Sequence, residues 1–126
     1  MKKLLLILML VPIFGISQAR LGSTRNEIYN EFELYYPKFE ISEDGLAYMH
    51  LETERSLLLY YFNNENLCNI SVIAPKTQGD LNFFVEQYNN SYVIMGPTEW
   101  RMYSANGAIS TIELVTHNGN TFFVWK

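Results

Sequence analysis

Cysteine is nearly absent from the chain, and this limits how its fold can be held together. Cys68 is the only cysteine among 126 residues, so no disulfide can form within one chain. Free cysteine is among the most buried residue types and behaves as a small apolar side chain. We therefore expect Cys68 in the core. A thiol nucleophile and an intermolecular disulfide are the alternatives, but no base lies close to Cys68 in the sequence.

Basic residues are also in short supply. The chain has 9 Lys and Arg against 13 Asp and Glu, for a net charge of −4. Proteins that bind nucleic acid need clustered basic residues to neutralise the phosphate backbone. An acidic chain without such a cluster excludes nucleic acid as a partner.

Several motifs of enzyme and cofactor sites are missing. The sequence contains no glycine-rich phosphate loop and no GxSxG elbow, which removes the usual signals of nucleotide binding and of α/β-hydrolases. The candidate zinc ligands His50, Cys68 and His117 have no short ligand spacing. We expect neither a cofactor nor a metal.

The first nineteen residues have the three parts of a secretory signal. Lys2 and Lys3 precede the apolar run Leu4–Phe14, and SQA at 17–19 places small residues where signal peptidase reads. The apolar run is too short to span a bilayer, which needs roughly 20 residues. We predict a signal peptide over residues 1–19 with cleavage near Ala19.

Cleavage there would leave a single domain over residues 20–126 in the periplasm or outside the cell. Arg20 occupies the position where a lipoprotein would carry its lipidated cysteine, so we expect no lipid anchor. No second apolar run is long enough to span a membrane. Loss of the two lysines would change the net charge from −4 to −6.

Two helices are predicted from capping signals and apolar spacing. Thr24 and Glu27 have the spacing of a capping box, and a helix over residues 24–35 would end before Pro37. Asp80 is the expected N-cap of the second helix, whose apolar residues recur with helical spacing up to Tyr88.

Strand-like runs follow each helix. Six are expected, over residues 45–54, 56–62, 67–74, 99–104, 108–116 and 121–126. Asn-Gly pairs at 106–107 and 118–119 indicate tight hairpins. The run YVIM at 92–95 is either an additional edge strand or the end of a loop.

Helix plus three strands therefore occurs twice, as structural half-repeats over residues 20–75 and 76–126. This order predicts an α+β fold, a tandem of helix plus three-strand meander. Its antiparallel sheet would have about six strands, with two helices packed on one face.

The segment LGSTRNEIYNEF at residues 21–32 resembles the start of the first helix in small periplasmic domains of the outer-membrane assembly lipoprotein type. The tandem layout is similar to the β-lactamase inhibitory protein architecture. The lipidated cysteine of the assembly lipoproteins is absent from this chain. The resemblance implies a protein-binding module of the envelope.

Binding is expected through aromatic side chains on the sheet face opposite the helices. Tyr48, Trp100 and Tyr103 are the candidate binding residues, because Trp and Tyr often dominate the energetics of interfaces. The partner would be an envelope or extracellular protein. We expect a small non-catalytic protein-binding module.

The alternative function is a small hydrolase. His50, Glu52 and Glu54 alternate along one strand, so their side chains would lie on the same face. A histidine beside a carboxylate can act as an oriented general base. The same alternation is also typical of a strand with one solvated face.

Overall fold

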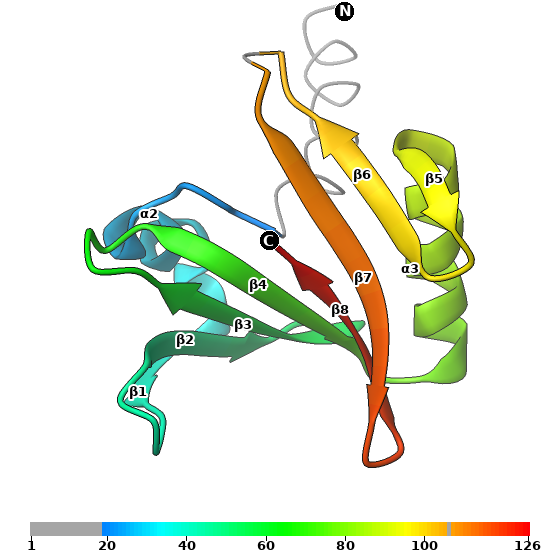
Figure 1. The fold of residues 1–126 in the computed structure, drawn as a ribbon. Helices are drawn as coiled ribbons and strands as arrows, with labels where there is room; N and C mark the ends of the chain where they lie inside the picture. Colours follow the sequence, from blue (N-terminus) through cyan, green and yellow to red (C-terminus); the bar gives the residue numbers. More distant parts are fainter. Residues whose placement is uncertain (1–18, 106) are drawn as a thin grey trace, which may run out of the picture.

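The computed structural model describes residues 19–105 and 107–126, which form a curved antiparallel sheet and two α-helices (Figure 1). The helices are α2 (Arg25–Glu31) and α3 (Gln78–Ser91), and a short 3-10 helix, η1 (Glu33–Tyr35), follows α2. The strands are β1 (Lys38–Ile41), β2 (Ala47–Glu52), β3 (Ser56–Phe62), β4 (Cys68–Pro75), β5 (Val93–Gly96), β6 (Glu99–Tyr103), β7 (Ile109–His117) and β8 (Asn120–Trp125). The predicted signal peptide lies outside the described residues except for Ala19.

The predicted fold class is wrong. The described residues form a mostly β structure with eight strands in one sheet, and 48% of these residues are in strands and 22% in helices. A sheet of about six strands with two helices packed on one face does not describe it. The two extra strands are β1 and β5, which lie at the two edges of the sheet.

Both extra strands are only four residues long, and β5 overlaps the YVIM run, for which an additional edge strand was one of the two alternatives. KFEI of β1 follows directly after Pro37, and VIMG of β5 lies between the end of α3 and Pro97. Such runs are too short for their alternation to stand out from a loop. The main chain enters β1 through Tyr36, whose φ of 52° is left-handed.

The order of the strands is β1-β2-β3-β4-β8-β7-β6-β5. Each half of the chain contributes one α-helix and four consecutive strands. The halves meet where β4 pairs with β8, through Ser71 with Trp125, Val72 with Val124 and Ile73 with Phe123. This short ladder is the joint between the two halves.

The helix starts follow side-chain capping. Thr24 and Glu27 form the predicted capping box of α2, with both side chains bonded to the opposite backbone N–H. The N-cap of α3 is Thr77 instead of Asp80, because the Thr77 hydroxyl accepts from the backbone N–H of Asp80 at 3.1 Å. Asp80 lies in the first turn of α3, where its negative charge interacts favourably with the positive end of the helix dipole.

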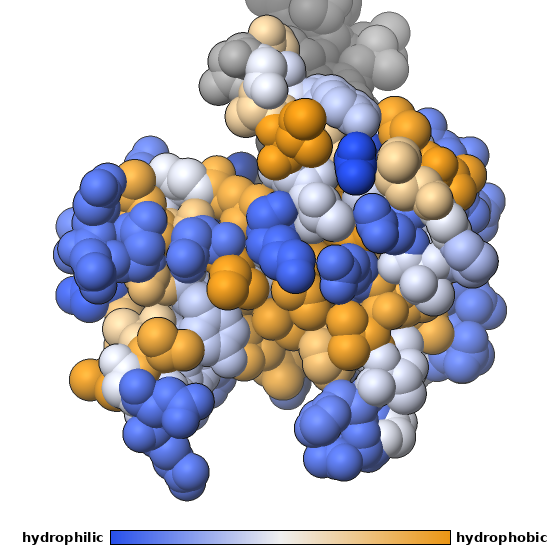
Figure 2. Space-filling view, viewed as in Figure 1, coloured by the Kyte–Doolittle hydropathy of each residue, from blue (hydrophilic) through white to orange (hydrophobic). Residues whose placement is uncertain are grey.

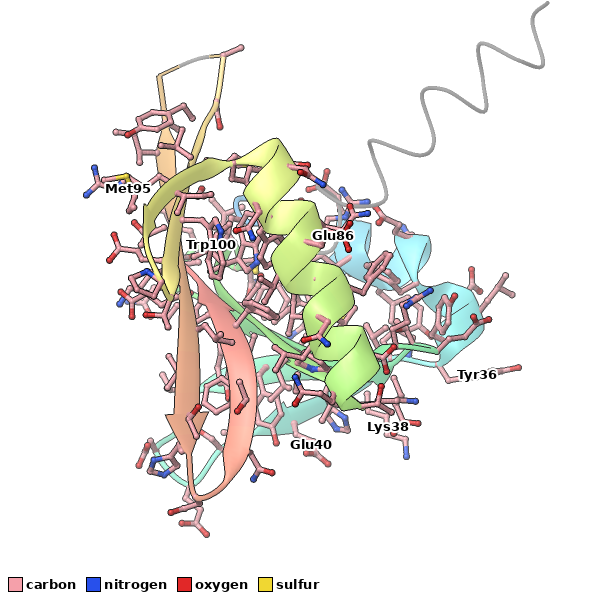
Figure 3. All side chains as sticks on the ribbon, turned by 90° about the vertical axis from the view of Figure 1, so that its right-hand side faces the viewer. Tyr36, Lys38, Glu40, Glu86, Met95 and Trp100 are labelled. Atoms are coloured by element: carbon pink, nitrogen blue, oxygen red, sulfur yellow. The ribbon has the colours of Figure 1, made fainter. Side chains whose placement is uncertain are left out.

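Aromatic side chains fill the core where α3 meets the sheet. Tyr88 contacts Trp100, Phe123 and Trp125 edge-on, with ring centroids 4.9–5.7 Å apart. The buried indoles keep hydrogen-bond partners: Trp125 donates to the Tyr88 hydroxyl and Trp100 donates to the Asn89 side chain at 2.8 Å. Figure 3 shows Trp100 beside α3. In the other half, Phe32 stacks on Tyr60.

We expect Asn89→Ala to lower the free energy of unfolding by about 1 kcal/mol, since the buried Trp100 N–H would lose its acceptor. Urea denaturation of purified protein measures this. Asn90→Ala is the matched control, because Asn90 is the next exposed asparagine of α3 and its substitution should change stability by less than about 0.5 kcal/mol. Equal effects of the two substitutions would contradict the assigned hydrogen bond.

Candidate functional site

Along the middle strands, half-buried side chains alternate with buried ones. The half-buried side chains lie on one face of the sheet, which is only partly covered. We call it the open face. At its centre lies an apolar strip of half-buried side chains from the middle strands: Leu59, Tyr61, Ile70, Val72, Val115, Phe122 and Val124. Figure 2 shows hydrophobic residues gathered at the middle of this face, with hydrophilic hairpin ends below on either side.

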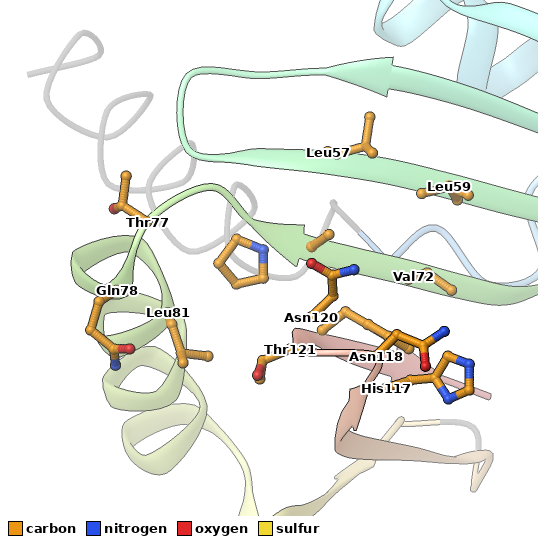
Figure 4. A pocket seen from close by; sticks show the side chains of 14 residues that line it. Leu57, Leu59, Val72, Thr77, Gln78, Leu81, His117, Asn118, Asn120 and Thr121 are labelled. Atoms are coloured by element: carbon orange, nitrogen blue, oxygen red, sulfur yellow. The ribbon is translucent and has the colours of Figure 1, made fainter.

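The strip continues into a hollow of about 610 Å³ at the end of β4 (Figure 4). Its apolar part comes from Leu57, Leu59, Val72 and Phe122 on the sheet and from Leu81 on α3. Its polar rim consists of Thr77 and Gln78 from the start of α3 and of the hairpin residues His117, Asn118, Asn120 and Thr121.

Proline at the end of β4 explains why the hollow opens there. The ladder between β4 and β8 ends at Ile73 and Phe123, and the next position of the same alternation on β4 is Pro75. Proline has no N–H to donate to a neighbouring strand. Beyond Ile73 the two strands are therefore unpaired, and Pro75 and Thr121 line the hollow instead of facing each other across a ladder.

The hairpin on the other side of the hollow is fixed by its turn. Asn118 and Gly119 both have positive φ, 52° and 80°, and join the paired residues His117 and Asn120. This is the two-residue turn that the Asn-Gly pair predicts. The rim side chains are therefore presented by a defined turn.

A polar cluster lies on the same face at the β1 side. The Tyr48 hydroxyl donates to Glu40 Oε2 at 2.8 Å, and His50 Nε2 lies 3.3 Å from the same oxygen. The hydrogen bond from Tyr48, followed by the nearby His50 and Lys38 charges, lowers the pKa of Glu40. The same hydrogen bond raises the pKa of Tyr48.

The three candidate catalytic residues do not meet. His50 has Glu40 as its neighbouring carboxylate, whereas Glu52 pairs with Lys76 at 3.1 Å. Glu54 is exposed in the turn that follows β2. The alternation that placed all three on one strand stops at Glu52, where the strand ends.

The three candidate binding residues lie in different places. Tyr48 is half-buried on the open face, where its ring contacts Tyr61 at 5.3 Å between centroids. Tyr103 is 54% exposed at the end of β6. Trp100 is 1% exposed and belongs to the core, so it cannot contribute to the open surface.

Cys68 is buried, and burial raises the pKa of its thiol. Its Sγ lies 3.4 Å from the Ser71 hydroxyl. In the part of the chain that the structure describes, no group of three or more His, Cys, Asp or Glu side chains could hold a metal. Within the same residues no helix is long and apolar enough to cross a membrane.

Sequence reasoning missed the hollow and its residues. In the sequence, nothing distinguishes Val72 and Phe122 from other strand residues. They lie close together because β4 pairs with β8, and these two strands are far apart in the sequence. Pro75 was the available signal, because it marked the end of an apolar strand run. The sequence did not predict that β8 is the strand whose pairing with β4 stops before Pro75.

Comparisons with protein-family models, with curated proteins and with solved structures find no match. The resemblance to envelope assembly and inhibitor domains therefore stays a prediction. Any function has to be argued from the geometry of the open face.

Tyr48→Phe should raise the pKa of Glu40 toward its ordinary value of 4.5, because the variant loses the hydrogen bond that contributes most to lowering it. A carboxyl with a lowered folded-state pKa adds stability above its ordinary pKa, and this stability is lost as the pH falls through the folded-state value. The stability gap between wild type and Tyr48→Phe should therefore be larger at pH 7 than in acid.

An NMR titration of the Glu40 carboxyl carbon measures the pKa, and urea denaturation at several pH values measures the stability gap. Tyr61→Phe is the control, since Tyr61 lies beside Tyr48 without a hydrogen bond to Glu40 among the described contacts. A Glu40 pKa that moves equally in both variants would show that the hydroxyl of Tyr48 is not the cause.

Proposed function

We propose that the protein is a small non-catalytic binding module that recognises another protein through its open face. The observation that carries this proposal is the apolar strip, which crosses the joint between β4 and β8 and runs into the hollow. Apolar side chains gathered on an exposed face are typical of interaction sites. The two ends of the curved sheet flank this strip (Figure 2).

The chemistry around the strip supports binding over hydrolysis. A hydrolase needs a nucleophile or an activated water next to a base. His50 stands beside Glu40 and Tyr48 on the β1 side, whereas the hollow lies at the end of β4. Because Glu52 and Glu54 point to other partners or to solvent, the residues of the hydrolase hypothesis are dispersed.

The proposed partner is a protein of the cell envelope or of the extracellular space. This follows from the signal-peptide pattern of residues 1–19 and from the acidic chain that remains after it. The proposed location is the periplasm or the external medium, after cleavage near Ala19. Cleavage after Ala19 would remove its buried side chain and the hydrogen bond that its carbonyl accepts from the Ser71 hydroxyl.

Open-face substitutions should abolish partner capture. We expect Leu57→Asp and Phe122→Ala to reduce recovery of bound protein from an envelope extract at least about tenfold, because the few central residues that dominate an interface cost about 2 kcal/mol or more when they are removed. The full chain with a C-terminal tag serves as bait, and quantitative mass spectrometry measures recovery.

Val93→Asp is the matched control for Leu57→Asp. Val93 is an exposed apolar strand residue at the β5 edge, away from the strip, and its variant should capture as wild type does. Thermal unfolding confirms that each variant is folded. Recovery that is the same for all variants, or no protein recovered above a scrambled-surface control, would refute binding through this face.

A further inference from the structure

The backbone of β8 beside the hollow is open to pairing. Thr111 and Lys126 exchange both of their backbone hydrogen bonds, at 2.8 and 3.0 Å. In a regular antiparallel ladder such pairs alternate with pairs that exchange none. The register of β7 and β8 is regular from Ile112–Trp125 to His117–Asn120, so Phe122 and Asn120 direct their N–H and C=O groups toward β7.

By the same alternation, the N–H and C=O of Phe123 and Thr121 point to the other side of β8, toward β4. Phe123 finds Ile73 there. The β4 residue that would come opposite Thr121 is Pro75, which has no N–H, and the described ladder ends before this position. The Thr121 C=O therefore has no donor at residue 75, and because the ladder ends at Ile73 and Phe123 the Thr121 N–H is also outside the β4 pairing and faces the hollow.

The described lining of the hollow contains His117 but no carboxylate, ammonium or guanidinium group. Among the fourteen described residues that line it there is no Asp, Glu, Lys or Arg, although these types make up 17% of the chain. An occupant with a formal charge would lose hydration there without gaining a counter-charge. Apolar side chains and neutral hydrogen-bonding groups fit this lining.

We infer that the hollow binds an extended, uncharged peptide segment of the partner protein. The segment would hydrogen-bond through its own main chain to the N–H and C=O of Thr121, at the place where Pro75 ends the ladder. An apolar side chain of the segment would rest on Leu59, Val72 and Phe122. This inference rests on the proposed binding function and specifies what is recognised.

An extended peptide satisfies both observations together. Main-chain hydrogen bonds to an unpaired strand supply affinity in peptide recognition by strand addition, and pockets for side chains supply specificity. A small apolar ligand would leave the Thr121 groups unused. A cationic ligand would meet no carboxylate in the described lining, and an anionic ligand would find only His117 on the rim. The peptide therefore accounts for the open backbone and for the neutral lining.

Amide hydrogen exchange of the free chain tests the backbone part without any partner. Thr121 should exchange at least about tenfold faster than Phe123 and Asn120, although all three belong to β8. Asn120 is the internal control, since it lies nearer the turn and would exchange fastest if the hairpin merely frayed. Protection of Thr121 equal to that of Phe123 would overturn the inference, whatever the outcome of partner capture.

Pro75→Val tests the cause of the opening. The valine N–H can donate to the Thr121 carbonyl, and this bond would bring the carbonyl of residue 75 within reach of the Thr121 N–H. The ladder should then extend by one pair, and the exchange of Thr121 should slow at least about tenfold. The exchange of Phe123 should change less. A Thr121 amide that stays equally fast in Pro75→Val, with the variant folded, would show that Pro75 does not hold the strands apart.

The identity of the occupant is tested by selecting binders of the full chain from a phage library that displays random twelve-residue peptides. Pro75→Val protein serves for counter-selection. The enriched peptides should be uncharged and apolar, should bind wild type at least about tenfold more tightly than Pro75→Val or Leu57→Asp, and should slow exchange of Thr121. Enrichment of charged peptides, binding that leaves Thr121 exchange unchanged, or no enrichment over the counter-selection would each refute the inference.

Discussion

The ladder between β4 and β8 is the constraint on which the rest of the structure depends. Among the described residues only three pairs join the halves of the sheet, and the side chains of those pairs lie on both faces. Trp125 and Phe123 turn inward to the Tyr88 cluster, which fastens α3 to the sheet. Val72 and Val124 turn outward into the apolar strip. The core and the candidate binding surface are thus built from the same short seam.

The proposed binding site lies where the ladder between β4 and β8 ends. A strand that continues past its neighbour presents backbone groups that water or another chain must satisfy. Here Pro75 ends the ladder, and the Asn-Gly turn at residues 118–119 holds the end of β8 in a defined hairpin. The polar cluster of Tyr48, His50 and Glu40 lies on the same face but apart from the hollow, and its contacts are internal to the β1 side.

The sequence predicted local features well and long-range pairing poorly. The capping box at Thr24, the Asn-Gly hairpin and the strands from β2 to β4 and from β6 to β8 were all expected, because neighbouring residues determine them. The strand count failed at β1 and β5, whose four residues carry too little periodicity. Trp100 was a candidate for the surface because alternation alone does not say which face is buried, and the hollow required the pairing of strands about fifty residues apart.

The order of the strands, two four-strand meanders joined at one ladder, has a consequence for folding. Every ladder except the seam joins strands that are consecutive in the chain, so each half can form its hairpins with short loops. The seam alone brings together residues 71–73 and 123–125, and closing so long a loop is entropically more expensive. Pairing of the two halves is therefore the ladder with the largest loop-closure cost, and the apolar strip, which takes side chains from both halves, is complete only once this ladder has formed.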